Sequence, residues 1–485
     1  MANTKIRTGF VADVHDWAEQ QFGGCDLGDV RRTERLVDYA ARQAAEPDAS
    51  TNAVCAGDDA LAEGTYRWVR NSAIDPKAVD EGPFVATVKA CSDRELVLAI
   101  QDTTTLTFSH ALAAKLGSVG GVEGRHVGGV LVHSTLMVDA RSREPLGLID
   151  QERWTRPIAA VCGKSKRRKA DQEHKKRPYE NKESVKWEQA TQRVSDRLED
   201  TTNVLTVCDR EADIYEYITY LVAHGQRFVL RAGQDRCLLT QNGRLFELMR
   251  KWPVLGTRLV DISQRGAQRG TQKQNKRESR SARTASMSIR KATVKLARPA
   301  NRRDGPESVE IGVVYLRERN APKGVEPAEW LLLTGEPVAK RVQVDRVIGY
   351  YECRWLIEEF HKAWKTGCRL EQRRFQSLGN LERFLAVTAP IAVRILQLRT
   401  LAQLSPDKSC SAILSRAHWQ CLAVKAEPGR AVPKRPPTVG WATIEIAKLG
   451  GWRDTKQTGR IGWQALWRGW SKLEALVEGW SLAQR

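Results

Sequence analysis

Several features by which chains are often classified are missing from this sequence. Its 10 cysteines include no C-x-x-C pair and no cluster with histidine, so neither a zinc site nor a disulfide framework is predicted. No apolar run approaches the roughly 18 residues of a membrane span. The first residues, "MANTKIRTGFVADVHDW", lack the apolar stretch of a signal peptide, and no repeat of fixed period is found. We therefore expect a cytosolic protein, without a membrane anchor, whose cysteines are reduced and structural.

Acidic residues are in short supply relative to basic ones. The chain carries 78 lysines and arginines against 58 aspartates and glutamates, which gives a formal charge of +20 and an isoelectric point near 9.6. This excess favours a polyanionic partner, either a nucleic acid or an anionic membrane surface, over an acidic small molecule. With 485 residues the chain is too long for one hydrophobic core. We therefore expect about two to four domains.

The pattern of the chain changes near residue 75. Before it, "DLGDVRRTERLVDYAARQAA" and "DDALAEGTYRWVRN" predict helices that carry many arginines. After it, β-type runs separated by turn residues predict three antiparallel strands, at 95–108, 127–140 and 144–154. A helix, a strand at 203–209, a second helix and a strand at 227–233 follow. The order βββαβαβ predicts an α/β domain with a mixed sheet covered by helices.

The remaining chain has two parts. Residues 234–345 contain short β-type runs and a basic stretch at 264–286, which predict an inserted β region with a mobile basic loop. Beyond residue 375 the pattern is mostly helical, with a proline-rich linker at 426–437. In the tail, apolar residues recur at helical spacing, which is typical of a core-facing stripe. They are Trp463, Leu466, Trp467, Trp470, Leu473, Val477 and Trp480.

Residues 350–365, "YYECRWLIEEFHKAWK", combine aromatic and charged side chains in one predicted helix. Its apolar residues fall on one side and predict a buried stripe, formed by Tyr350, Cys353, Ile357, Phe360 and Trp364. A polar line on another side is formed by Tyr351, Arg354, Glu358 and Lys365. Taken alone, this line is typical of a solvated face, whose i,i+4 ion pairs contribute only a few tenths of a kcal/mol each.

Three acidic residues are candidates for metal chemistry. Asp102 and Asp209 each end an apolar β-type run, and ligands of α/β sheets usually bind at such strand ends, although a single aspartate there is more often a turn former. If these strands are adjacent and the helix at 350–365 crosses their ends, Glu358 joins them. Three carboxylates at one point require cations between them, and oxygen ligands suit Mg²⁺ or Mn²⁺. Two such ions about 3.5 to 4 Å apart promote phosphoryl transfer, so the prediction is a metal-dependent nuclease.

These motifs together resemble a known family. The spacing Tyr351-x2-Arg354-x3-Glu358-x6-Lys365, within "IEEFHKAWKTG", is similar to the Y-R-E-K motif of bacterial DDE transposases of the IS-four family, in particular those of the Tn-five type. "AIQDTTTL" and "VCDREADI" resemble the two aspartate motifs of that family. The likeness extends over nearly the whole chain, through "LGDVRRTERLV", "EGTYRWVRN", "EWLLLTGEPV" and "RIGWQALWRGW".

The resemblance implies a domain organisation. It predicts a helical DNA-binding domain at 1–75, an RNase H-like catalytic domain at 76–375 that includes the β-rich insertion, and a helical dimerisation domain at 376–485. The tryptophan stripe at 463–480 then becomes a candidate dimer surface, with core packing as the alternative. The protein would work in the bacterial cytosol, in association with the nucleoid.

The resemblance also implies a reaction on double-stranded DNA. Asp102, Asp209 and Glu358 would hold two Mg²⁺ ions, for which Mn²⁺ can substitute. Water would nick a transposon end, the freed 3′-hydroxyl would form a hairpin with the opposite strand, and water would reopen it. The 3′-hydroxyl would then join target DNA. No covalent enzyme intermediate is needed, and a homodimer would hold two transposon ends.

Matching positions imply which residues contact DNA. Arginine and lysine suit phosphate binding, and a tryptophan can stack on a base that is flipped out of the duplex. The assigned residues are Tyr351, Arg354 and Lys365 for phosphate, Trp330 for the flipped base, Arg210 for the backbone, and Arg32 and Arg35 for the end sequence. There are structural alternatives, because Trp330 could belong to a sheet core and Arg210 could pair with Glu211 or Asp213. Surface arginines on a helix are also unspecific.

One segment departs from the family pattern. The loop at 162–182 is longer and more basic than expected, and such charge runs are usually solvated. Two other functions remain open, a catalytically inactive DNA-binding repressor of transposition and an RNase H-like nuclease that cuts without joining. The repressor is disfavoured because the sequence retains all three carboxylates and the basic N-terminal helix.

Overall fold

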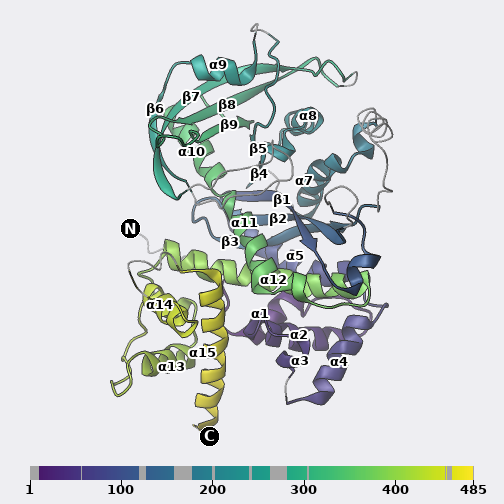
Figure 1. Ribbon diagram of the computed structural model, residues 1–485, viewed down its shortest axis with the longest axis vertical. Coiled ribbons are helices and arrows are strands. Elements are labelled where there is room, and N and C mark those ends of the chain that lie inside the picture. Colours follow the sequence, from purple (N-terminus) through teal and green to yellow (C-terminus); the bar gives the residue numbers. More distant parts are fainter. Residues whose placement is uncertain are drawn as a thin grey trace.

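One mixed β-sheet runs through the described part of the protein (Figure 1). The computed structural model describes residues 10–55, 57–119, 127–157, 177–198, 203–239, 243–262, 281–302, 305–453, 455 and 461–483. In these ranges the sheet has nine strands, in the order β3-β2-β1-β4-β5-β9-β8-β7-β6. The helices from the two ends of the chain lie together at the bottom of Figure 1, where α15 contacts α2.

The N-terminal residues form helices, as predicted, because polar side chains cap them. The helices are α1 (Val14–Phe22), α2 (Val30–Ala45), α3 (Thr51–Val54) and α4 (Asp59–Arg70). In each, the preceding side chain accepts a hydrogen bond from a backbone N–H of the first turn; these caps are Asp13, Asp29, Ser50 and Asp58. A further helix, α5 (Pro76–Cys91), starts with proline after the Asp75 cap and leads into the sheet.

The predicted order βββαβαβ is confirmed. Its elements are β1 (Val97–Thr107), β2 (Gly129–Asp139), β3 (Pro145–Trp154), α7 (Lys186–Arg197), β4 (Val204–Cys208), α8 (Tyr215–Ala223) and β5 (Arg227–Arg231). The first three strands are antiparallel, β4 is parallel to β1, and β5 is parallel to β4. Short 3₁₀ turns lie between these elements, among them η5 (Arg210–Ala212) directly after Asp209.

The insertion extends the same sheet. It contains α9 (Leu245–Lys251), β6 (Gly256–Ile262), β7 (Arg283–Ala297), β8 (Ser308–Glu318) and β9 (Glu329–Thr334). Because β9 pairs antiparallel with β5, the inserted strands continue the order of the first five strands. Helix α9 was not predicted. Most of the basic stretch at 264–286 and of the loop at 162–182 lies outside the described residues.

The segment predicted as one helix over 350–365 is divided. Helix α10 (Arg341–Glu352) ends in a turn at 353–354, α11 (Trp355–Lys362) follows, and η7 (Ala363–Gly367) is a π-helical turn. The single-helix prediction is wrong. Periodicity could not reveal the break, because the apolar residues stay aligned across it.

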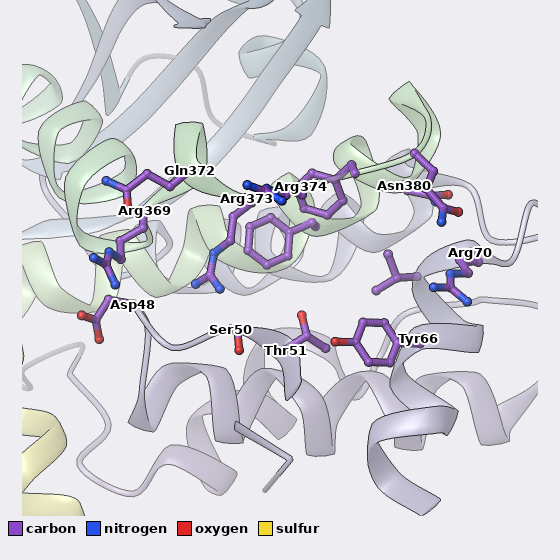
Figure 2. A pocket seen from close by; sticks show the side chains of 14 residues that line it. Asp48, Ser50, Thr51, Tyr66, Arg70, Arg369, Gln372, Arg373, Arg374 and Asn380 are labelled. Carbon is purple, nitrogen blue, oxygen red and sulfur yellow. The ribbon is translucent and has the colours of Figure 1, made fainter. Parts of the chain in front are cut away.

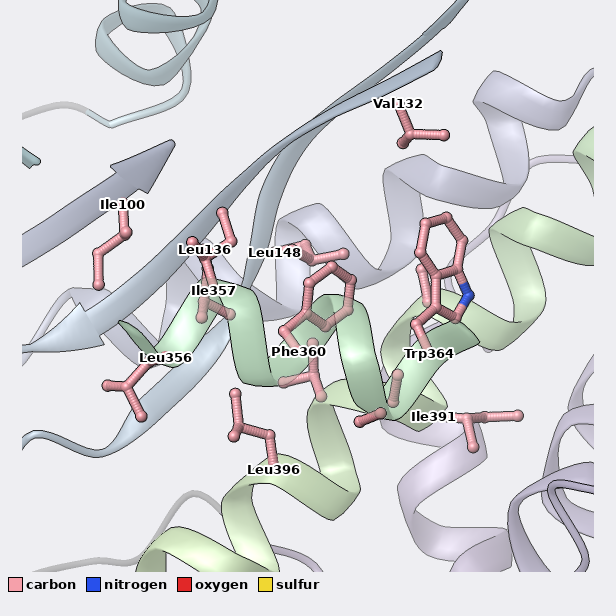
Figure 3. Packing of buried hydrophobic residues seen from close by; sticks show 14 of the residues in the cluster. Ile100, Val132, Leu136, Leu148, Leu356, Ile357, Phe360, Trp364, Ile391 and Leu396 are labelled. Atoms are coloured by element: carbon pink, nitrogen blue, oxygen red, sulfur yellow. The ribbon is translucent and has the colours of Figure 1, made fainter. Parts of the chain in front are cut away.

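The predicted apolar stripe nevertheless faces the core. Ile357, Phe360 and Trp364 are fully buried, Cys353 is 2% exposed, and Tyr350 is half-buried. Figure 3 shows α11 between the sheet and helix α12 (Leu378–Leu404). Helix α11 is therefore packed by apolar contacts on both of its sides.

Helix α12 is a core helix of the protein. Within the described ranges it is the one helix long and apolar enough to cross a membrane, but 94% of its apolar window is buried. Its buried arginines bind backbone carbonyls of the N-terminal region: Arg383 Nε donates to Ile74 O at 2.7 Å, and Arg394 Nη2 donates to Ala12 O at 2.7 Å. These bonds tie the N-terminal helices to the sheet through α12.

The C-terminal helices pack on the rest of the chain. They are α13 (Arg416–Ala426), α14 (Val439–Leu449) and α15 (Trp463–Ala483), and the proline-rich linker lies between α13 and α14. The first five residues of the predicted stripe on α15 are buried within the chain, namely Trp463, Leu466, Trp467, Trp470 and Leu473. Val477 and Trp480 are half-buried. The stripe is therefore mainly core packing.

All nine described cysteines are free, and eight of them are buried. The prediction of reduced, structural cysteines stays a prediction. Cys237 is the exposed one among them, and Cys162 lies outside the described residues.

Candidate active site and nucleic-acid interface

Asp102 and Asp209 lie side by side where β4 ends. The last pair in the parallel register of β1 and β4 is Gln101 with Cys208, so the next residue on each strand is an aspartate. Successive side chains of a strand point to opposite faces. Ile100 and Val207 belong to the core cluster that contains α11, so both aspartates lie on the face that α11 covers.

The predicted position of Asp102 needs one correction. It does not end its strand, because β1 continues to Thr107 in register with β2. The neighbouring strand β4 ends at Cys208 instead, which opens one side of β1 beyond Gln101. The site therefore forms at the carboxyl end of β4, and Asp102 reaches it from the middle of β1.

The environment of Asp102 disfavours its charge. Burial raises the pKa of its carboxyl to about 7, and the negative charges of Asp209 and, more weakly, Glu358 act in the same direction. Arg354 and the backbone N–H of Thr103, which donates to Oδ1 at 2.8 Å, oppose this shift of the pKa. The three predicted carboxylates are therefore close enough to interact electrostatically.

Glu358 is turned toward another partner. Its side chain is 57% exposed, and Oε1 accepts a hydrogen bond from Arg354 Nη2. This is the i,i+4 ion pair that the sequence predicted. Within the described ranges, no three His, Cys, Asp or Glu side chains are arranged to hold a metal ion. Carboxylates repel one another unless cations lie between them, so the pair with Arg354 is the arrangement that electrostatics favours for the chain by itself.

The two aspartates have the chemistry of a metal site. Asp102 Oδ1 accepts the Thr103 N–H, and Asp209 Oδ1 accepts the Glu211 N–H at 2.8 Å. In the part of the chain that the structure describes, the second oxygen of each carboxylate has no hydrogen-bond donor, although His361 Nδ1 lies 3.9 Å from Asp102 Oδ2. Hard carboxylate oxygens that remain available side by side at the end of β4 fit Mg²⁺ or Mn²⁺. A third ligand from Glu358 requires this side chain to leave Arg354.

Basic side chains flank these carboxylates. Burial has the largest influence on the Arg354 guanidinium and lowers its pKa. The pKa is nevertheless raised above its ordinary value by the nearby Tyr351, Glu358 and Asp102. Lys365 lies on η7, where burial lowers its pKa while Glu371 and Asp102 oppose this effect. Arg354 and Lys365 of the predicted polar line therefore both lie near Asp102, one before and one after Glu358 in the sequence.

Two aromatic side chains join this group. Tyr351 is 4% exposed, and burial raises the pKa of its hydroxyl, against Arg231 and Arg354. The rings of Tyr351 and Trp330 meet edge to face, with centroids 5.4 Å apart. Trp330 is half-buried on β9 and packs on the core, so part of its ring remains accessible. The structure brings both near the site, although Tyr351 is buried rather than on a solvated line.

His361 was missed by the sequence reasoning. It is 6% exposed, lies 3.9 Å from Asp102 through Nδ1, and its buried Nε2 has no hydrogen-bond partner among the described residues. Burial, and then the charge of Lys365, lower its pKa to about 3, so the imidazole is neutral at physiological pH. Its place three residues after Glu358 in "EEFHK" was visible, but a histidine beside an apolar stripe gives no signal by itself.

Two family models match the chain. One is described as Transposase DNA-binding and matches residues 14–74, which cover α1 to α4. The other is described as Transposase DDE domain and matches residues 178–391, which include Asp209 and Glu358. The chain belongs to the DDE transposases.

This membership is consistent with the fold class of the described chain. A large mixed sheet with helices is consistent with the RNase H-like domain of a DDE transposase, and such enzymes cut DNA with divalent metal ions. The prediction of a DNA-binding transposase is confirmed at this level. The narrower assignment to the IS-four family and the Tn-five type stays a prediction.

Two predicted DNA contacts of the transposase, Arg32 and Arg35, lie half-buried on α2. Arg32 Nη1 donates to Leu27 O at 2.8 Å. Arg35 lies against Gly64 of α4, where an added Cβ would be 3.1 Å from the Arg35 Cζ. Both arginines therefore help to pack this helical region, and their contact with DNA stays a prediction.

Arg210 is exposed on η5, directly after Asp209. One of its alternative partners is engaged elsewhere, because buried Asp213 accepts hydrogen bonds from Arg236, with a shortest distance of 2.6 Å. Asp213 also accepts the Gly233 N–H at 2.7 Å. This pair fixes the turn after β4, and Arg210 lies on the surface beside the site.

An arginine-lined groove of about 450 Å³ separates α3 and α4 from the segment at 369–380 (Figure 2). Its lining includes one acid, Asp48, and four arginines, Arg70, Arg369, Arg373 and Arg374. Arg373 is fixed by donating to Pro47 O at 3.2 Å, whereas the other three are exposed. The sequence shows three of these arginines within 369–374. It could not show that they face the DNA-binding helices.

Proposed function

We propose that this DDE transposase moves DNA by a cut-and-paste reaction. The observation that carries the proposal is that Asp102 on β1 and Asp209 directly after the adjacent β4 lie on the sheet face that the Glu358 helix covers. The match to a DNA-binding domain on the same chain supports double-stranded transposon ends and target DNA as substrates. The likeness to the Tn-five type supports a hairpin intermediate and joining of the 3′-hydroxyl ends.

Asp102, Asp209 and Glu358 would hold two Mg²⁺ ions, with Mn²⁺ as a substitute. When bound, such ions activate the attacking oxygen and stabilise the leaving oxygen of a phosphodiester. Asp102 offers its free carboxylate oxygen from β1, and Asp209 offers its own directly after β4. Glu358 leaves Arg354 to complete the site, and this exchange frees the Arg354 guanidinium to bind a DNA phosphate.

The other side chains would position DNA. Lys365 and Arg354 hold phosphate beside the cut strand, and Tyr351 supports Arg354, whose guanidinium lies 6.0 Å from the centre of the tyrosine ring. Trp330 would stack on a flipped base of the hairpin, and Arg210 would contact the backbone. The helical region of Arg32 and Arg35 would recognise the end sequence.

The assembled enzyme would be a homodimer that holds two transposon ends in the bacterial cytosol. The proposed domains are 1–75 for DNA binding, 76–375 for catalysis and 376–485 for dimerisation. Because most of the tryptophan stripe is buried within the chain, a dimer interface on α15 would use its last turns, where Leu482 is 63% exposed.

A cleavage assay tests this function. Linear DNA that carries the sequences flanking the gene is incubated with the full chain, with and without Mg²⁺. We expect metal-dependent nicks, hairpin ends and strand-transfer products, and no products from Asp209→Ala. Nicks without hairpins or joining would instead indicate a nuclease. End binding without any cut would indicate a repressor of transposition.

The arginine-lined groove is proposed to hold the DNA backbone between the DNA-binding helices and the active site. We expect the double variant Arg70→Gln, Arg374→Gln to bind DNA roughly ten-fold more weakly at physiological salt, with a salt dependence smaller by about 2 in log–log slope, because two phosphate contacts are lost. Fluorescence anisotropy across a range of salt concentrations measures both quantities. The control is Arg430→Gln, an exposed arginine of the linker paired with Glu427. Equal slopes for all three proteins would contradict the proposal.

A further inference from the structure

Helix α11 carries two neighbouring glutamates with different surroundings. Glu358 is 57% exposed beside Arg354, whereas the side chain of Glu359 is 21% exposed. Glu359 Oε2 accepts hydrogen bonds from Arg399 Nη1 of α12 and from Trp463 Nε1 of α15, the latter at 2.6 Å. One carboxylate thus joins α11 to both helices.

The three side chains form one compact group. The Arg399 guanidinium lies 4.4 Å from the centre of the Trp463 ring, so it contacts the same indole that donates to Glu359. Trp463 is 5% exposed and the Arg399 side chain is 15% exposed. Hydrogen bonds that involve charged groups in such a sheltered place are short, strong and directional.

A second contact holds the same segment further along. Gly367, the last residue of η7, faces the Trp467 ring, from which an added Cβ would be 3.4 Å away. Trp463 and Trp467 are one helical turn apart on α15. This helix therefore touches α11 and η7 on either side of Lys365.

The ends of α11 do not fix the helix by themselves. It has 8 residues, its N-cap Arg354 makes no side-chain capping bond, and it runs directly into the π-helical turn. Its apolar side chains pack on the sheet and on α12 (Figure 3). Apolar contacts are non-directional, so they constrain the rotation of a short helix less tightly than hydrogen bonds do.

We propose that Glu359, Arg399 and Trp463 form a clamp that sets the rotation of α11 and so aims Glu358 at the metal site. In this clamp Glu359 is a positioning residue, and the C-terminal helix contributes to the chemical step. The inference rests on the proposed role of Glu358 as a metal ligand. The clamp would give Trp463 a positioning role within its own subunit.

Glu359→Gln and Trp463→Phe test the clamp in the full chain. The first keeps an acceptor for the indole N–H but removes the charge, and the second keeps the ring under Arg399 but removes the donor. We expect each variant to cut DNA about ten-fold more slowly at low Mn²⁺ and to need more Mn²⁺ for half of its maximal rate, because Glu358 is misplaced. DNA binding in EDTA, which does not use Glu358, stays at the parental level.

Glu474→Gln is the matched control. Glu474 lies on the same helix α15, and its Oε2 lies 3.0 Å from His418 Nε2 of α13, so the variant breaks a comparable link that does not reach α11. We expect its Mn²⁺ dependence to equal that of the parent. An equal shift in Glu474→Gln would show a general loosening of α15 and overturn the clamp.

Glu358→Gln separates failure of the clamp from failure of the proposed function. If Glu358→Gln cuts at the parental rate, the proposed metal site is wrong. If Glu358→Gln is inactive while Glu359→Gln and Trp463→Phe match the parent at every Mn²⁺ concentration, the metal site stands and the clamp is wrong. Thermal unfolding of all variants identifies any that does not fold. If Glu359→Gln does not fold, the Mn²⁺ dependence of Trp463→Phe tests the clamp.

Discussion

The Asp102→Asn transposase is expected to cut DNA at least about 10³-fold more slowly than the parent, while it still binds DNA. Asparagine keeps the shape of the side chain and its bond to the Thr103 N–H, but it removes the anionic oxygen that a divalent cation needs. Loss of a ligand at the reacting phosphate removes stabilisation of the charge that develops in the transition state. The measurement is single-turnover cleavage of labelled transposon-end DNA with saturating enzyme and Mg²⁺.

The companion measurement is DNA binding in EDTA. Removal of one negative charge beside a phosphate site does not weaken binding, so the affinity should match or exceed that of the parent. Asp261→Asn is the control, because this exposed aspartate of β6 accepts a hydrogen bond from Thr284 at 2.7 Å, which asparagine can keep, and Asp261 is not one of the proposed metal ligands. An Asp102→Asn enzyme that retains more than a tenth of the parental rate would rule out Asp102 as a metal ligand.

The same substitution is expected to stabilise the metal-free protein at neutral and alkaline pH. The pKa of Asp102 is about 7 in the fold, against an ordinary value of 3.8. Between these values the folded protein binds more protons than the unfolded chain, so its free energy of unfolding falls as the pH rises through this window and levels off above about 7. Asparagine cannot ionise, so the variant does not lose this part of the free energy of unfolding. We expect the stability difference between variant and parent to grow by about 2 kcal/mol from pH 5 to pH 8.

Urea unfolding in EDTA at both pH values measures this difference. Addition of Mn²⁺ at pH 8 should stabilise the parent, because the cation offsets the repulsion between Asp102 and Asp209, and should do little for Asp102→Asn. A pH-independent difference between the two proteins would show that Asp102 is ionised in the metal-free fold throughout this range.

Parts of the site that follow from local pattern were predictable from the sequence. The apolar runs before Asp102 and Asp209 predicted strands, and the order of elements predicted that both would enter one mixed sheet. That the two aspartates share the face covered by α11 depends on the register of β1 with β4, which no local pattern encodes. Local patterns therefore predicted which strands and helix lie beside the two aspartates, but not the position of Asp102 within its strand.

Features that depend on contacts between distant segments were not predictable. The break between α10 and α11 leaves the apolar spacing intact. The π-helical turn packs on the distant helix α12, where Trp364 Nε1 donates to Thr388 at 3.0 Å. The arginine-lined groove requires residues 48–70 to meet residues 369–384, and the clamp on Glu359 requires α11, α12 and α15 to meet. Composition and periodicity carry no information on such contacts between distant segments.

The most direct test is the structure of the transposase bound to transposon-end DNA and Mn²⁺, with the metal located by anomalous scattering. We predict Mn²⁺ about 2 Å from carboxylate oxygens of Asp102 and Asp209, with Glu358 turned from Arg354 to the metal and Arg354 on a DNA phosphate. Mn²⁺ held elsewhere, with Glu358 still paired to Arg354 in the DNA complex, would contradict the assignment of these three carboxylates.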